Sequence, residues 1–139
     1  MILLDTNVLS ALMQATPEPA VLRWLDAQPV ESVWTTTITV FEVHFGLALL
    51  PSGRRRQRLE AAFDHAITVV LGGRVLAFDR QAATAAGAMA AEGRLHGRTV
   101  DVRDVQIAGI TAVRRATLAT RNIRHFDHLG IVLVDPWSA

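Results

Sequence analysis

The chain begins with Met1-Ile2-Leu3-Leu4-Asp5-Thr6-Asn7, an apolar run that gives way to an acid, a hydroxyl and an amide. Consecutive apolar residues before Asp5 predict a short strand that is buried on both faces. Apolar residues then recur at helical spacing from Val8 to Met13, so a helix should follow directly. Open α/β sheets bind ligands at the carboxyl ends of their strands, where a carboxylate can point into a crevice. We therefore expect Asp5 to belong to a functional site whose other residues come from later in the chain.

The rest of the chain alternates between short apolar runs and longer amphipathic stretches. Strands are expected at 32–35, 74–78, 117–120 and 131–134, and helices at 19–28, 38–50, 54–67 with Ser52 as its cap, 80–95 and 101–115, with a helical turn in 121–129. This alternation predicts a three-layer α/β/α fold, in which helices flank a mostly parallel central sheet. No repeat or linker interrupts the pattern, so residues 1–139 should form a single domain.

The composition limits the cellular compartment in which we expect the protein and the kinds of functional site that it can contain. Half of the residues are hydrophobic, but no apolar run approaches the roughly 18 residues of a membrane span. The first residues carry no basic flank typical of a signal peptide, so we expect a soluble, cytoplasmic protein with no membrane partner. Because the chain has no cysteine, disulfides, thiolate metal sites and cysteine nucleophiles are excluded.

All 14 basic residues are arginines, because the sequence contains no lysine. The absence of lysine argues against phosphate loops, Schiff-base enzymes and phosphoryl-aspartate domains, all of which normally use a lysine. Arginine binds phosphate in a bidentate manner, so a chain with a net charge of only +1 can still carry a local phosphate-binding surface.

Two further acids interrupt helix faces that otherwise look apolar. Glu42 shares a predicted stripe with Ile38 and Phe45. Asp104 shares a predicted face with Ile107. Both carboxylates should therefore point inward, where an unpaired charge is unfavourable by several kcal/mol.

Each of the three acids also has a purely structural explanation. Asp5 would cap the first helix, Glu42 would pair with an arginine, and Asp104 would interact with a helix dipole. If the three cluster, however, no lysine is present to neutralise them, and a hard divalent cation, Mg²⁺ or Mn²⁺, is the economical solution. A cation held by carboxylates at a strand end suits phosphoryl chemistry, because it polarises a phosphate oxygen and lowers the pKa of a bound water.

Four elements appear in an order and at a spacing typical of one family. They are Leu4–Asn7, Thr39–Glu42 followed by Phe45-Gly46, Asp104 with Ile107-Ala108, and Thr120-Arg121-Asn122, with Asp135-Pro136-Trp137 closing the chain. In these residues the sequence resembles PIN-domain ribonucleases, and most closely the VapC/FitB branch of bacterial toxin–antitoxin systems.

The resemblance implies a parallel sheet with helices on both faces and a metal-dependent endoribonuclease. Such a protein is the toxin of a type II toxin–antitoxin pair, and it hydrolyses RNA phosphodiester bonds with a metal-activated water. The resemblance assigns the catalytic and metal-binding roles to Asp5, Glu42 and Asp104, with Mg²⁺ or Mn²⁺ as the cofactor. It also implies a homodimer and a cognate VapB/FitA-type antitoxin that inhibits the toxin, with operator DNA bound only through the antitoxin.

Other residues of the matching motifs are candidates for substrate binding or for supporting the cluster. Thr6 and Thr120 are expected to hydrogen-bond the carboxylates or their waters, while Asn7 orients the acid at the first strand end. Arg121 and Arg124 are candidates for binding substrate phosphate.

Asn122 departs from a common form of the family, in which an acid occupies that position. An amide supplies no charge there, so the sequence does not decide which residue fills the fourth acidic position. Asp101, one helical turn before Asp104, is a second candidate for it, although a capping role is the simpler explanation of Asp101. His125 is expected to be structural.

Two alternatives remain beside the nuclease. A non-catalytic PIN-like module that binds RNA or protein would explain the missing acid at Asn122. A haloacid-dehalogenase-like phosphatase also places an aspartate at the end of its first strand, but it needs a second acid where this chain has Asn7, and a downstream lysine.

Overall fold

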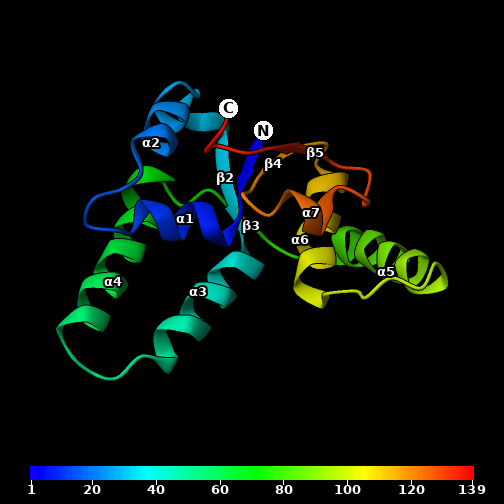
Figure 1. Cartoon of the computed structure of the whole chain (residues 1–139), viewed down its shortest axis with the longest axis horizontal. Coiled ribbons are helices and arrows are strands. Elements are labelled where there is room, and N and C mark those ends of the chain that lie inside the picture. Colours follow the sequence, from blue (N-terminus) through cyan, green and yellow to red (C-terminus); the bar gives the residue numbers. More distant parts are fainter.

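The computed structural model describes all 139 residues and contains one sheet of five parallel strands flanked by helices (Figure 1). The strands are β1 (Ile2–Leu4), β2 (Val33–Thr36), β3 (Val75–Leu76), β4 (Thr117–Ala119) and β5 (Val132–Val134). The helices are α1 (Thr6–Leu12), α2 (Pro19–Asp26), α3 (Thr37–Leu49), α4 (Arg54–His65), α5 (Arg80–Leu95), α6 (Val102–Val113) and α7 (Ile123–Phe126). A 3₁₀ turn at Val30–Ser32 precedes β2, and a π-helical turn at Ala66–Val70 follows α4. None of these helices has both the length and the apolar character needed to cross a membrane.

The order of the strands in the sheet is β3-β2-β1-β4-β5, with β1 in the centre. Ile2 of β1 lies opposite Val33 of β2 on one side and Thr117 of β4 on the other. The chain moves outward from β1 through β2 to β3, and it then returns to the other side of β1 for β4 and β5. The strand order therefore reverses between β1 and β4, and in such sheets the crevice that binds ligands opens at the carboxyl ends of these two strands.

Two hydrophobic cores lie on opposite faces of the sheet. Leu4 packs with residues of α1 to α4 on one face, whereas Leu3 packs with α5, α6 and α7 on the other. Both leucines are completely buried, as expected for a central strand of a parallel sheet. Figure 1 shows the two groups of helices on either side of the strands. The predicted three-layer α/β/α architecture is confirmed.

The buried face of α3 differs from the predicted one. The structure buries Thr39, Val43 and Leu47, whereas Phe45 and Leu49 of the predicted stripe are 52% and 71% exposed. Apolar residues occur on nearly every side of this helix, so their spacing does not identify the side that packs against the sheet. The prediction that Glu42 shares a core-facing stripe with these residues was therefore wrong.

Helix starts were predicted more accurately than strand lengths. Asp79 and Asp101 cap α5 and α6, each accepting a hydrogen bond from a backbone N–H three residues later. The predicted cap of α4 was wrong: Gly53, with φ of 152°, occupies that position instead of Ser52. Strand β3 contains two residues of the five expected at 74–78.

Gly109 provides a test of the packing between α5 and α6. A Cβ atom at this position would lie 2.5 Å from the Ala82 carbonyl oxygen and 2.9 Å from the Ala86 Cβ. We expect Gly109→Ala to lower the free energy of unfolding by at least about 1 kcal/mol, because the rigid backbone of α5 must move.

Gly87→Ala is the matched control, because Gly87 lies in α5 with nothing within 4 Å of an added Cβ. Alanine is favoured over glycine inside a helix by roughly 0.5–1 kcal/mol, so this variant should be at least as stable as the wild type. Urea denaturation measures both, and similar effects of the two substitutions would contradict the close packing at Gly109.

Candidate active site

Asp5 lies at the carboxyl end of β1, at the reversal point of the sheet, and its side chain is almost fully buried. One carboxylate oxygen, Oδ1, accepts a hydrogen bond from the Thr6 backbone N–H at 2.8 Å, so Asp5 also caps α1. The other, Oδ2, accepts from the Thr120 hydroxyl at 2.8 Å and from the Asn7 amide at 3.2 Å. Both oxygens are therefore held in place by donors from the end of β1 and the end of β4.

Further hydrogen bonds fasten the two strand ends to one another. The Asn7 side chain donates to the Thr120 hydroxyl at 3.2 Å, and its oxygen accepts from the Arg121 backbone N–H at 3.0 Å. The Asn122 backbone N–H donates to the same Thr120 hydroxyl at 3.0 Å. Thr120 and Asn7 thus connect Asp5 to the segment that follows β4.

Glu42 reaches the same region from α3. Its Oε1 accepts a hydrogen bond from the Thr6 hydroxyl at 3.0 Å, and its Oε2 lies 3.9 Å from the Arg103 guanidinium. The side chain is 22% exposed, because this face of α3 borders a pocket instead of the core. Glu42 therefore points toward the site, although for a different reason from the one its sequence pattern indicated.

Asp104 comes from the first turn of α6. Its Oδ2 lies 3.2 Å from Nδ1 of His125, a residue of α7, and its side chain is 23% exposed. The Asp104 backbone N–H donates to the Asp101 carboxylate at 3.1 Å, which is the capping contact of α6.

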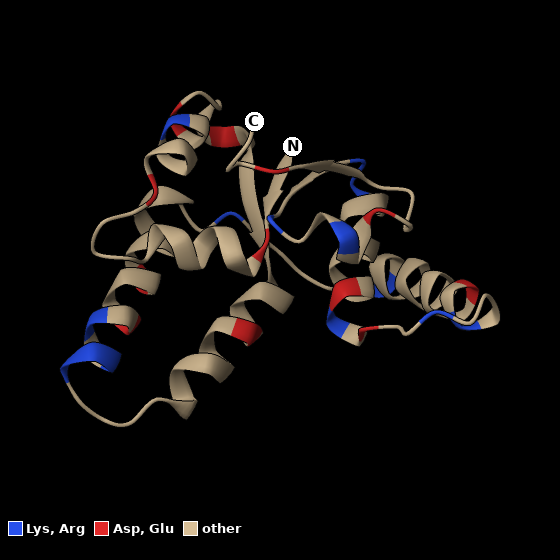
Figure 2. Ribbon diagram, in the orientation of Figure 1, with Lys and Arg blue, Asp and Glu red and all other residues tan.

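The three acids line a single pocket of about 500 Å³ at the carboxyl edge of the sheet. Figure 2 shows acidic positions on α3 and α6 on the two sides of the central gap. Arg121, Asn122 and Trp137 complete the rim. Asn122 lines this pocket together with the three acids, whereas Asp101 lines a neighbouring pocket.

Burial raises the pKa of the Asp5 carboxyl, although its hydrogen bonds from Thr120, Thr6 and Asn7 partly offset the effect. Burial also raises the pKa of Glu42, which the negative charges of Asp5 and Asp104 raise further. These shifts show that negative charge is unfavourable in this pocket.

The pKa of Asp104 is also raised. Its pKa is raised first by burial and then by the nearby charges of Asp101 and Asp5, while His125 lowers it in part. A carboxyl whose pKa is raised by burial and by neighbouring acids is stabilised in its charged form by a cation.

The donor set fits a hard divalent cation, because all three acids offer carboxylate oxygens and no sulfur ligand is present. In the structure as it stands, no three Asp, Glu or His side chains are arranged around one metal position. The carboxylates of Glu42 and Asp104 are turned toward Thr6 and His125 instead. Binding one ion through all three acids would therefore require these side chains to reorient.

Three residues at the site were not expected from the sequence. His125 contacts Asp104, Arg103 approaches Glu42, and the Arg121 guanidinium lies 4.8 Å from the centre of the Trp137 ring. No local spacing indicates the first contact, because Asp104 lies in α6 and His125 in α7. Trp137 reaches the site only through the fold, because it follows the last strand.

Comparisons with known proteins show the family to which the chain belongs. The chain matches the family described as "PIN domain" over residues 2–132. It is 37% identical to the VapC ribonuclease Y4jK of Sinorhizobium fredii, and the match covers 99% of each chain. It is 33% identical to Toxin FitB of Neisseria gonorrhoeae, again over 99% of each chain. A solved structure of FitAB bound to an IR36 DNA fragment superimposes with a TM-score of 0.87 at 33% identity, covering 99% of this chain and 96% of that chain.

The raised pKa values predict how stability depends on pH in the absence of metal. Between the ordinary and the raised pKa of each acid, the folded state binds more protons than the unfolded state, so the free energy of unfolding falls as pH rises. This window begins at about pH 4, the ordinary pKa range of Asp and Glu.

We expect Asp5→Asn to make this fall shallower, because it removes one of the titrating groups. Asp26→Asn, at an exposed position on α2, is the matched control and should keep the wild-type slope. Chemical denaturation in a chelator across the window measures the slopes, and equal slopes for wild type and Asp5→Asn would contradict the prediction.

Proposed function

The chain belongs to the PIN-domain family, in its branch of VapC- and FitB-type toxins, and on that basis we propose that it is a divalent-metal-dependent endoribonuclease. Residues 1–139 act as one nuclease domain. One observation carries the proposal: Asp5, Glu42 and Asp104 come from three elements to line one pocket at the reversal point of the sheet.

Asp5, Glu42 and Asp104 would hold Mg²⁺ or Mn²⁺, since their oxygens are ligands that these ions prefer. When bound, the cation supplies Lewis-acid chemistry, polarising a phosphate oxygen and lowering the pKa of water. The raised pKa values of the three acids support this assignment, because a cation relieves the unfavourable charge that the protein concentrates there.

The surrounding side chains position the acids. Thr120 and Asn7 orient the Asp5 carboxylate by donating to Oδ2, and Thr6 donates to Glu42. Loss of such supporting hydrogen bonds typically costs roughly 10–100-fold in metal affinity or activity.

Arg121 is the residue best placed to bind a phosphate of the RNA backbone. Its backbone N–H is tied to Asn7, and its guanidinium lies against the Trp137 ring at the rim of the site. Stacking on an aromatic ring restricts the guanidinium, so less freedom is lost when it pairs with a phosphate.

RNA cleavage with Mg²⁺ or Mn²⁺ tests the proposal directly. We expect cleavage of single-stranded RNA that a chelator abolishes, and a loss in Asp5→Asn greater than the roughly 10–100-fold typical of an outer-shell change. Asp26→Asn should cleave like the wild type and controls for contaminating nuclease, since both variants are purified identically. Undiminished, chelator-resistant cleavage by Asp5→Asn would overturn the assignment.

A non-catalytic module that binds RNA or protein is the second candidate. The observation in its favour is Asn122, because an uncharged amide lines the pocket at the motif position where many members of the family carry an acid. It predicts RNA binding without metal-dependent turnover, so the same experiment separates the two functions.

The chain's partners follow from its relatives and from its surface. We propose a cytoplasmic homodimer that is inhibited by a VapB/FitA-type antitoxin and reaches operator DNA only through that antitoxin, as the DNA-bound FitAB structure suggests by analogy. The exposed apolar face of α3 supports a protein contact, because Phe41, Phe45 and Leu49 are all more than half exposed there, and the two phenylalanine rings are stacked.

Co-expression with a short neighbouring gene that encodes a DNA-binding protein tests the partnership. We expect a stable complex in which RNA cleavage is suppressed and operator DNA is bound, while the isolated toxin binds no operator. A complex with full nuclease activity would contradict inhibition. A charge at the apolar face, Phe45→Glu, should weaken dimerisation or antitoxin binding, whereas Val69→Glu, at an apolar position outside α3 that is also more than half exposed, should weaken neither.

A further inference from the structure

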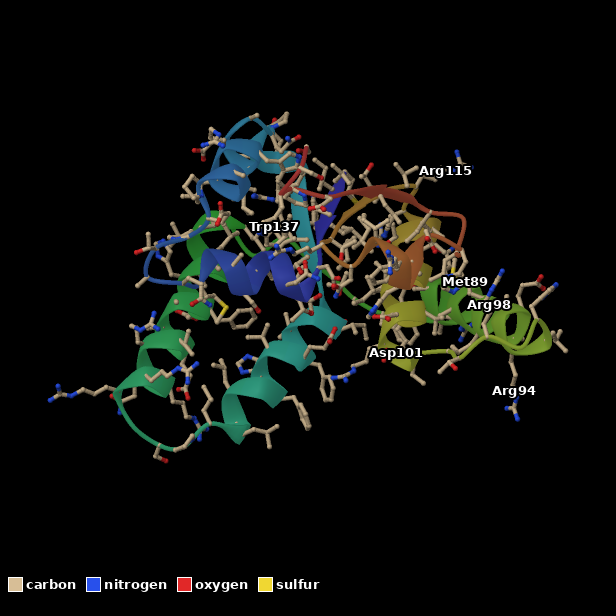
Figure 3. All side chains as sticks on the ribbon, viewed as in Figure 1. Met89, Arg94, Arg98, Asp101, Arg115 and Trp137 are labelled. Atoms are coloured by element: carbon tan, nitrogen blue, oxygen red, sulfur yellow. The ribbon has the colours of Figure 1, made fainter.

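A second pocket, of about 410 Å³, lies directly beside the acid site and shares Asp104 with it. Its wall is formed by α5, the segment that leads into α6, α7 and the turn after α7. In Figure 3, Met89 on α5 and Asp101 before α6 mark two sides of this region. The volume is within the range of pockets that bind small organic groups.

The pocket is lined by both apolar side chains and planar polar ones. Met89, Val105 and Leu129 supply apolar surface, and the planar side chains of His125 and His128 join the lining. Apolar surface beside imidazole and guanidinium planes is the environment in which proteins bind unstacked nucleobases.

Arg124 and Asp101 add charge of both signs to the same lining. One Asp101 oxygen caps α6 by accepting from the Asp104 backbone N–H. Its other oxygen can accept a hydrogen bond from an amino group of a base. Because the lining carries both a carboxylate and a guanidinium, it offers a hydrogen-bond acceptor and a donor to a neutral base.

We propose that this pocket receives one unpaired nucleobase of the RNA strand, next to the phosphate that lies at the acid site. The proposal rests on the proposed nuclease function. Because Asp104 borders both pockets and His125 lies 3.2 Å from its carboxylate, the two pockets are within the reach of a single nucleotide. The Asp101 acceptor favours adenine, cytosine and guanine, which carry amino groups, over uracil.

Nucleoside binding to the metal-free full chain tests the pocket separately from catalysis. In an NMR titration, adenosine and cytidine should shift the backbone amides of Gly93, Val105 and Leu129, uridine should do so more weakly, and ribose should not. Met89→Trp fills the pocket and should abolish the shifts, whereas Leu95→Trp, at a position of α5 that is 82% exposed, should retain them. A retained amide spectrum shows that each variant is folded.

Cleavage kinetics supply the second measurement. Met89→Trp should raise KM for single-stranded RNA by roughly fivefold or more, with a smaller change in kcat, and Arg124→Ala should raise it in the same direction without altering the core. Leu95→Trp should keep the wild-type KM.

The possible results are distinguishable. Amide shifts on nucleoside addition without RNA cleavage would contradict the proposed nuclease function but support the base pocket. The opposite result is RNA cleavage with no amide shifts on nucleoside addition and with an unchanged KM in Met89→Trp. It would contradict the base pocket but support the nuclease function. That second result is also expected if a segment of a protein partner occupies the pocket.

Discussion

The hydrogen bond from the Thr120 hydroxyl to the Asp5 carboxylate joins the carboxyl ends of the two central strands, β1 and β4. Parallel pairing brings these ends together at the point where the strand order reverses. Asn7 extends the link to the segment after β4, which carries Arg121 and Asn122 to the rim of the site.

The second constraint is the burial of negative charge. Three carboxyl groups with raised pKa values share one pocket, where the Arg103 guanidinium approaches Glu42 and the His125 imidazole contacts Asp104. An arrangement optimised for stability alone would separate these acids or pair them. A site that accumulates unfavourable charge and offers only hard oxygen donors is suited to a divalent cation, and the stability lost there is consistent with a functional role.

Helices α6 and α7 form part of the wall of the second pocket, which lies beside the acid site. The first turn of α6 presents Asp104 to one pocket and, through its cap, places Asp101 beside the other. His125 of α7 contacts Asp104, so the two pockets are separated by these two side chains and not by the hydrophobic core. Chemistry at the phosphate and selection of a base are thereby proposed to occur within one nucleotide of each other.

The sequence by itself determined the layered fold, the central strand and the acid at its end, because these depend on short apolar runs and local capping signals around residues such as Asp5 and Asp79. It also identified the residues that carry the family resemblance. Only the tertiary structure decided which face of α3 is buried and that Asn122 lines the pocket of the three acids while Asp101 does not. Periodicity cannot distinguish the faces of a helix that is apolar all round, since packing against the sheet makes that choice. Contacts such as those of His125 with Asp104 and of Trp137 with Arg121 join segments distant in sequence, so they arise only when the strand order brings those segments together.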